Sequence, residues 1–178
     1  MFSLWTISLS PDALKFLEAQ RTSNVSDSQL FYRMVSVISV MSRRLKITIG
    51  GIPFIAELLE RRAPETCRQM IAALPIEGMV IQARWSGEAA WLPMDEFGIE
   101  PLLENATSYP SRGDLLYYPG GVSEKEMLIP YGATCFSSRV GQLQGNHFAT
   151  IVEGAERLGE MGRKVLWEGA QEIRINAE

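Results

Sequence analysis

Short stretches of alternating apolar and polar residues dominate the chain from Arg43 onward. Leu45 to Ile49 alternates with the period of a strand, Gly50-Gly51 predicts a two-residue hairpin turn, and residues 52–58 provide the return strand. Pro64 opens a helix with apolar residues at helical spacing, and Pro75 ends it. The remaining pattern predicts a second helix over 154–166 and short strands over 78–85, 89–92, 113–118, 127–130, 133–137, 148–152 and 170–175. Many short strands with two single helices favour a mainly β closed barrel or sandwich over an alternating α/β fold.

The first 42 residues follow a different pattern. They carry a Ser/Thr-rich run over 22–28 and no clear glycine turn, and Met34 and Met41 are alternative translation starts. We therefore divide the chain into residues 1–42, an N-terminal arm or an over-extended start, and residues 43–178, the barrel domain. A genuine helical extension packed on that domain is the alternative.

Composition narrows the function. The 178 residues contain 17 Lys and Arg against 21 Asp and Glu, a net charge of −4, which disfavours a general nucleic-acid binder. No apolar stretch reaches the roughly 18 residues of a membrane span, and the start does not resemble a signal peptide. Two cysteines, Cys67 and Cys135, and one histidine, His147, exclude a disulfide framework and a multi-histidine metal site. We expect two buried thiols, a cytoplasmic location, no metal and no cofactor.

Several motifs carry a family resemblance. The helix start Ala63-Pro64-Glu65-Thr66 and the run from Asn146 to Ala155, NHFATIVEGA, resemble the cyclophilin fold. The segments at 83–89, 104–110, 113–121, 131–132 and 141–148 are more closely similar to a bacterial family of small cyclophilin-like proteins of unknown function. The resemblance spans about residues 43–176. It implies a closed eight-stranded β-barrel with a helix at each end.

The resemblance does not extend to a complete isomerase motif. Prolyl isomerases of the cyclophilin family use an arginine on the strand after the first helix, and Arg84 occupies the corresponding place. The aromatic residue expected five positions later is Ala89, and the methionine and glutamine that should follow are absent. Prolyl isomerase activity is therefore not expected from the motif.

The segment around Arg84 concentrates the candidate chemistry. Arg84 could hold a carboxylate or polarise an amide carbonyl, Glu88 could pair with it or act as a base, and Trp85 and Trp91 would form an aromatic wall. Strand alternation would place Arg84 and Trp85 on opposite faces. The competing interpretation is an ordinary surface Arg–Glu pair across a hairpin.

A second group of polar residues could supply hydrogen bonds to the same ligand. Asn105, Thr107 and Tyr109 belong to a polar loop, and His147 precedes an apolar strand. A turn stabilised by Asn and Thr side chains, and a structural histidine bonded to the backbone, are the alternatives.

These residues lead to one favoured function and two alternatives. We expect a ligand-binding protein whose pocket near Arg84 holds a small amide- or carboxylate-bearing molecule or a peptide. An isomerase- or amide-hydrolase-type enzyme would instead bring Arg84, Glu88 and His147 within roughly 3–7 Å of one another. A non-catalytic subunit or interaction protein, including a homo-oligomer, is the third hypothesis.

Overall fold

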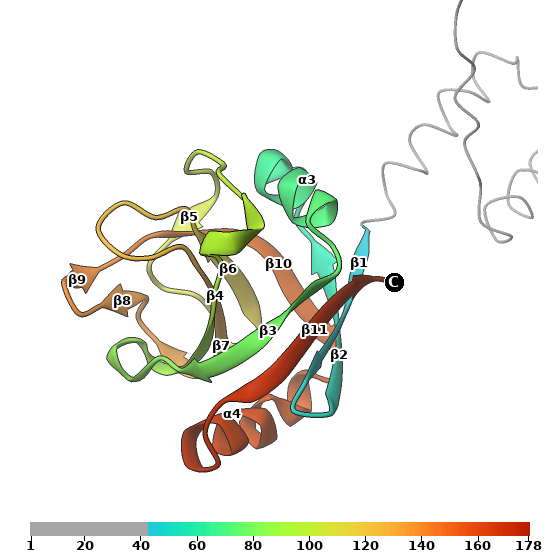
Figure 1. The fold of residues 1–178 in the computed structure, drawn as a ribbon, viewed down its shortest axis with the longest axis vertical. Coiled ribbons are helices and arrows are strands. Elements are labelled where there is room, and N and C mark those ends of the chain that lie inside the picture. The colour runs from blue at the N-terminus through green and yellow to red at the C-terminus, as the bar shows by residue number, and fades with distance from the viewer. Residues whose placement is uncertain (1–42) are drawn as a thin grey trace, which may run out of the picture. The chain divides into compact units, whose positions relative to one another are not determined.

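The computed structural model describes residues 43–178, and the prediction of an N-terminal arm lies outside them. Eight antiparallel strands form a ring in the order β2, β1, β11, β3, β4, β7, β6, β10, and pairing of β10 with β2 closes it (Figure 1). Their bounds are β1 (Arg44–Ile49), β2 (Ile52–Leu58), β3 (Ile76–Gln82), β4 (Gly87–Pro93), β6 (Asp114–Tyr118), β7 (Glu126–Thr134), β10 (Gly145–Glu153) and β11 (Gln171–Ala177).

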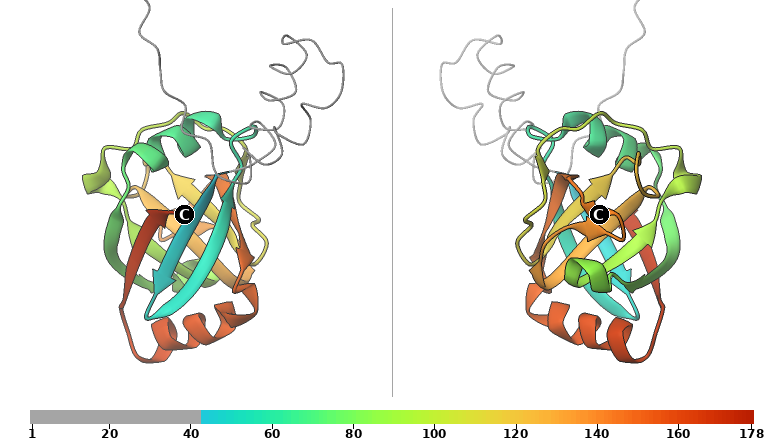
Figure 2. Two further views of the ribbon diagram at one scale, coloured as in Figure 1. Left: turned by 90° about the vertical axis from the view of Figure 1, so that its right-hand side faces the viewer. Right: turned by 90° about the vertical axis from the view of Figure 1, so that its left-hand side faces the viewer.

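Two helices cover opposite ends of the barrel, as Figure 2 shows. Helix α3 (Pro64–Ala72) begins at its proline, whose missing N–H is tolerated in the first helical turn. Helix α4 (Leu158–Trp167) follows a short 3₁₀ turn, η3 (Ala155–Arg157), and packs Leu158, Met161 and Val165 inward. The predicted mainly β architecture, a closed eight-stranded barrel with two helices, is confirmed.

Smaller elements decorate the ring. Strand β5 (Ala106–Thr107) pairs with the start of β10, and β8 (Ser137–Ser138) pairs with β9 (Gly141–Gln142) in a separate two-stranded sheet. Two 3₁₀ turns, η1 (Arg84–Ser86) and η2 (Asp95–Phe97), flank β4.

The turn η1 corrects the predicted strand over 78–85. Strand β3 ends at Gln82, and the Ser86 amide donates to the Ala83 carbonyl at 2.9 Å, which closes a tight turn. Gly87 completes it with φ +101°, and a Cβ there would lie 2.6 Å from the Ala133 carbonyl oxygen. Arg84 and Trp85 therefore lie in a 3₁₀ turn, and the prediction that they belong to a strand is wrong. The two side chains nevertheless line different recesses. The two strands predicted over 127–130 and 133–137 are largely one strand, β7.

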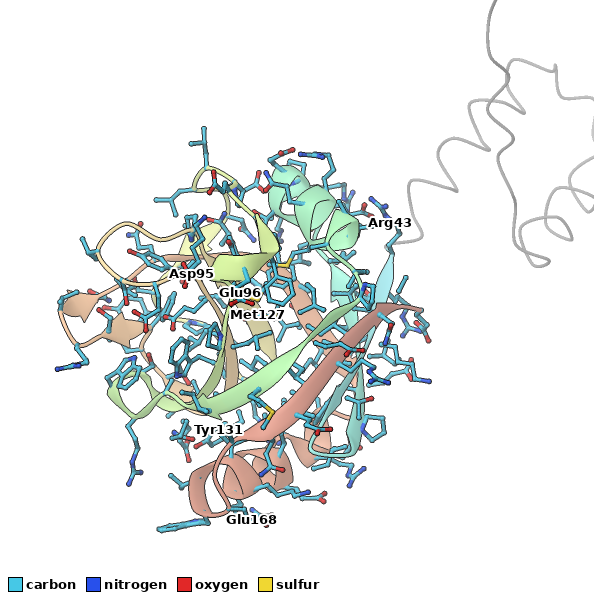
Figure 3. All side chains as sticks on the ribbon, viewed as in Figure 1. Arg43, Asp95, Glu96, Met127, Tyr131 and Glu168 are labelled. Carbon is cyan, nitrogen blue, oxygen red and sulfur yellow. The ribbon has the colours of Figure 1, made fainter. Side chains whose placement is uncertain are left out.

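Strand alternation builds a core on each side of β7. Met127, Ile129 and Tyr131 face the main core inside the barrel, and Met127 and Tyr131 are labelled in Figure 3. Leu128 faces outward and joins a second buried group, here called the outer cluster. The loop that carries β8 and β9 contributes Phe136 and Leu143 to it. The full outer cluster is Ala83, Ala89, Trp91, Leu116, Tyr118, Leu128, Phe136 and Leu143.

Candidate functional site

A groove of about 420 Å³ lies between η1 and helix α4, and it contains two of the predicted residues, Arg84 and Glu88. Gln82 and Tyr131 line its barrel side, and Arg163 lines its helix side. The helix approaches closely because Gly162 faces the Tyr131 ring without a side chain of its own. We call this recess the Arg84 groove.

Its polar groups are arranged by hydrogen bonds. Glu88 Oε2 accepts from the Ala133 amide at 2.7 Å, so its carboxylate is tied to β7. Tyr131 donates its hydroxyl to Gln82 Oε1 at 2.8 Å, and burial raises the pKa of Tyr131. Arg84 and Arg163 have no ion pair with any residue of the described range 43–178. The groove therefore presents two guanidinium groups that are free to bind an anion.

The two predicted tryptophans contact each other but do not line this groove. Their ring centroids are 6.2 Å apart, with the planes tilted by 58°. Trp85 is 42% exposed and lines a separate cavity, while Trp91 is buried in the outer cluster. An aromatic pair thus adjoins the η1 turn, on a different recess from Arg84.

His147 lies in another polar group, on β10. Its Nε2 is 2.9 Å from Thr150 Oγ1 and 3.2 Å from Asp114 Oδ1. Burial raises the pKa of Asp114, but hydrogen bonds from His147, the Ser111 amide and Thr150 outweigh it, so the net shift is downward. The three predicted acid–base residues are not brought into one site, because His147 contacts Asp114 and Thr150 while Arg84 and Glu88 line the groove.

The loop residues predicted as ligand donors serve the loop itself. Asn105 adopts φ +48° and donates its side-chain amide to the His147 carbonyl at 2.7 Å. Thr107 Oγ1 accepts from the Tyr109 amide at 3.0 Å. Tyr109 is exposed. None of the three lines the Arg84 groove, so their role in ligand binding stays a prediction.

The cysteines differ from expectation in one respect. Cys67 is buried, as predicted, but Cys135 is only half-buried, because it lies at the edge of the loop that covers the outer cluster.

Within residues 43–178, no group of three or more His, Cys, Asp or Glu side chains is placed to hold a metal ion. In that range no helix has the length and apolar character that a membrane crossing needs.

Sequence reasoning missed Arg163 and Tyr131 of the groove, and also Glu126, a buried carboxyl on the cavity that Trp85 lines. Arg163 lies among charged residues of a helix, a pattern typical of a solvated face, and only the packing of α4 on the barrel brings it into the groove with Arg84. Glu126 directly precedes the apolar run from Met127 to Ile129, which is the one sequence signal that it starts a buried strand.

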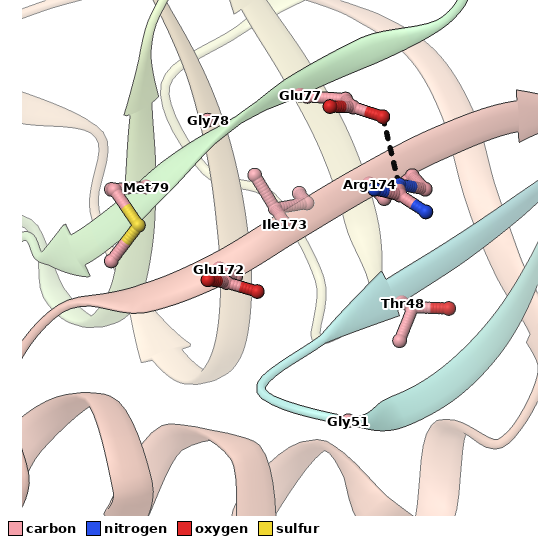
Figure 4. A pocket seen from close by; sticks show the side chains of 8 residues that line it. All are labelled: Thr48, Gly51, Glu77, Gly78, Met79, Glu172, Ile173 and Arg174. Carbon is pink, nitrogen blue, oxygen red and sulfur yellow. Dashed lines mark ion pairs between the residues drawn. The ribbon is translucent and has the colours of Figure 1, made fainter.

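A further recess, of about 540 Å³, lies elsewhere on the barrel and is drawn in Figure 4. It runs over the outer face of β3, β11 and β1, between Met79 and Thr48. Its guanidinium is already neutralised, because Arg174 Nε lies 2.8 Å from Glu77 Oε1. No residue of the predicted site lines it, and its paired charges leave no free anchor for an anion.

Comparisons with known proteins agree with the fold. The structure of McbB in complex with tryptophan is similar at a TM-score of 0.61 and 20% identity, over 74% of this chain and 44% of that one. The chain thus spans less than half the length of that neighbour. The solution structure of the hypothetical protein AF2241 from Archaeoglobus fulgidus is similar at a TM-score of 0.54 and 22% identity. The match covers 77% of this chain and 95% of that one.

At these identities the likenesses concern the fold alone, and the cyclophilin-like assignment, with which the barrel is compatible, stays a prediction. No curated protein matches the chain. Residues 45–177 match the family model described as "Protein of unknown function (DUF3830)", and the chain therefore belongs to the DUF3830 family.

Proposed function

We propose that this protein binds a small molecule or peptide that carries a carboxylate or an amide, in the Arg84 groove. The observation that carries the proposal is the pair of guanidinium groups, Arg84 and Arg163, which line one recess and have no ion pair within residues 43–178. Guanidinium groups bind carboxylates through two parallel N–H···O bonds, so two of them on facing walls favour such a ligand over a cation.

The other lining groups suit the rest of such a ligand. The Gln82 side chain and the Tyr131 hydroxyl form a hydrogen-bonded pair that offers further polar contacts. Glu88 is already held by the Ala133 amide, so it shapes the wall and accepts one more donor, such as a peptide N–H. Leu166 adds an apolar contact from α4. The groove is therefore matched to a polar ligand with an acidic or amide head.

A precedent comes from the structural neighbour McbB, whose structure was determined with tryptophan. Tryptophan carries a carboxylate, so that neighbour, of which this chain covers 44%, binds a ligand of the class proposed here. The likeness is one of fold, and the Arg84 groove is argued from this chain's own residues.

The enzyme and interaction hypotheses receive less support. The enzyme hypothesis needs Arg84, Glu88 and His147 around one substrate, and His147 is engaged with Asp114 and Thr150 on β10. No feature of residues 43–178 favours the interaction hypothesis over ligand binding. Ligand binding in the Arg84 groove is therefore the function that we carry forward.

A thermal-shift screen of the full chain tests this proposal. The panel contains small carboxylates, amino-acid amides, lactams and prolyl peptides, because a ligand that binds only the folded state raises its stability by RT ln(1 + [L]/Kd). We expect a carboxylate or amide to raise Tm, and Arg84→Ala and Arg163→Ala each to weaken its affinity by about tenfold or more.

Arg61→Ala is the matched control, since Arg61 is also an exposed arginine without an ion pair in the described range but lies outside the groove. We expect this variant to keep the wild-type affinity. An Arg84→Ala variant that binds as tightly as the wild type, or a panel in which no member shifts Tm, would overturn the proposal.

A further inference from the structure

A second recess, of about 340 Å³, lies beside the outer cluster and shares no lining residue with the Arg84 groove. Its wall includes Trp85 from η1, Glu124 and Glu126 at the start of β7, and the loop residues Arg139 and Val140. We call it the Trp85 cavity. Nothing in the proposed function uses it.

Glu126 is the unusual member of this cavity. It is 3% exposed, yet its Oε1 is buried without a hydrogen-bond partner among residues 43–178. Across the sheet its neighbours are Pro93, which has no N–H, and Tyr118. A buried carboxyl without a donor is costly, and burial together with the charge of Glu124 raises the pKa of Glu126 to about 8.

Two donors of the cavity are directed elsewhere. Ser123 donates its hydroxyl to Glu124 Oε2 at 3.2 Å, and the Tyr118 hydroxyl accepts from the Val122 amide at 3.1 Å. Arg139 is exposed and makes no hydrogen bond or ion pair with Glu126. No described residue therefore donates to Glu126 Oε1, and a bound molecule with a donor group is one way to satisfy it.

The remaining walls define what else that partner carries. Trp85 is held at 6.2 Å from Trp91, ring centroid to ring centroid, and leaves 42% of its surface open. Val122 and Val140 are 71% and 70% exposed on the same recess. An indole face attracts cations, and apolar side chains beside it favour a hydrocarbon group. An anion would meet two carboxyl groups, Glu124 and Glu126, against one guanidinium, Arg139. A ligand without a donor would leave Glu126 Oε1 unsatisfied.

We propose that the Trp85 cavity binds a small primary amine. Its ammonium donates to the Glu126 carboxylate, which releases its proton to solvent on binding, and lies against the Trp85 ring while the hydrocarbon group contacts the two valines. This is a second site, with a ligand of opposite charge to the one assigned to the Arg84 groove. It does not depend on the proposed function.

Titration with benzylamine tests it, and benzyl alcohol and benzoate serve as neutral and anionic probes of similar size. Calorimetry and tryptophan fluorescence of the full chain follow binding, since Trp85 lines the cavity. We expect saturable binding of benzylamine and much weaker binding of the other two. Glu126→Gln keeps the shape of the side chain. It should lower the affinity for benzylamine by about tenfold or more, because the charge-assisted bond between the ammonium and the carboxylate is lost.

Glu168→Gln is the matched control, because Glu168 is an exposed glutamate that lines neither recess. It should change the affinity by less than about threefold. Trp85→Leu provides a second variant at a partly exposed position. It should lower the affinity for benzylamine several-fold through loss of the cation–π contact.

Three results would overturn the amine site. These are benzyl alcohol or benzoate binding as tightly as benzylamine, a Glu126→Gln variant with wild-type affinity, and no binding of benzylamine at all. Arg84→Ala should leave benzylamine binding unchanged, and Glu126→Gln should leave carboxylate binding in the Arg84 groove unchanged. The two proposals therefore fail independently.

Discussion

The Tyr131 ring lies against Gly162, so closely that a Cβ at position 162 would come within 2.3 Å of Tyr131 Cδ2. This contact joins the middle of helix α4 to strand β7. It sets the distance between the two walls of the Arg84 groove, because Tyr131 and Arg163 line it from opposite sides.

Gly162→Ala is expected to destabilise the protein by about 1–3 kcal/mol, since the ring must move to admit a methyl group into a packed contact. Gly159→Ala is the matched control in the same helix, where the nearest atom to a new Cβ is Arg163 Nη1 at 3.8 Å. The Gly159→Ala variant should gain up to about 1 kcal/mol in free energy of unfolding, because alanine favours a helix more than glycine does. Urea denaturation measures both, and equal effects at the two positions would contradict the packing argument.

Asn146 is the polar centre that ties α3 and the 102–104 segment to β10. It is fully buried, and its side-chain amide donates to Thr66 Oγ1 at 3.0 Å and to the Leu102 carbonyl at 2.9 Å. Its Oδ1 accepts from the Glu104 amide at 3.0 Å. Asn146→Ala should cost about 2–4 kcal/mol, because the buried Thr66 hydroxyl, the Leu102 carbonyl and the Glu104 amide each lose a hydrogen bond to a fully buried side chain.

The measurement is the free energy of unfolding in urea, with Asn176→Ala as the control. Asn176 is half-buried on β11, and its side chain makes no hydrogen bond within residues 43–178. Asn176→Ala should lower the free energy of unfolding by less than about 1 kcal/mol. A cost at Asn146 as small as that at Asn176 would show that water replaces the three bonds.

Glu126 makes stability depend on pH in a direction opposite to that of most carboxylates. Its pKa rises from the ordinary 4.5 to about 8 in the folded protein, so between these values the folded state holds a proton that the unfolded state releases. The folded state therefore loses stability as pH rises from about 4.5 through 8. Glu126→Gln removes this effect.

The stability gained by Glu126→Gln over the wild type should be greater at about pH 9 than at about pH 5, by on the order of a few kcal/mol. Denaturation of both proteins at several pH values gives the difference directly. A difference independent of pH would mean that Glu126 ionises in the folded protein as it does in water.

The two thiols should react at different rates in the native protein. Cys67 is buried, donates to the Phe148 carbonyl at 3.3 Å, and has its pKa raised to about 12, chiefly by burial. Cys135 is half-buried beside Ser137 and Gln142. Iodoacetamide should label Cys135 first, and Cys67 at least about tenfold more slowly, because the thiolate is the reacting form.

Mass spectrometry of the tryptic peptides separates the two positions. In denaturant, both thiols should react at similar rates, which serves as the internal control. Equal labelling in the native protein would contradict the burial of Cys67.

The sequence signals that succeeded were local. Gly50-Gly51 specifies a hairpin through backbone geometry, and Pro64 specifies a helix start, so β1, β2 and α3 could be placed without tertiary information. The end of the strand at Gln82 could not be placed from the sequence, because Arg84 and Trp85 continue an apolar–polar alternation. The hydrogen bond from the Ser86 amide to the Ala83 carbonyl and the packing of Gly87 on the Ala133 carbonyl show where the chain turns.

The candidate site was predicted less well, for a related reason. Arg84 and Glu88 are four residues apart and remain neighbours in any compact turn. His147 is distant in sequence, and its partner Asp114 could not be chosen before the register of β6 with β10 was known. Glu126 carries no motif, and its importance comes from its surroundings.

Closure of the ring by β2 and β10 also bears on how the chain folds as it is made. The hairpin of β1 and β2 is complete at Leu58, but the outer edge of β2 pairs only with β10, which begins at Gly145, and the outer edge of β1 pairs with β11, the last strand. During synthesis this hairpin therefore has two unsatisfied edges while most of the barrel is still missing. Such edges recruit other strands. The step at which a newly made chain is most exposed to aggregation is thus set by the topology of its first hairpin.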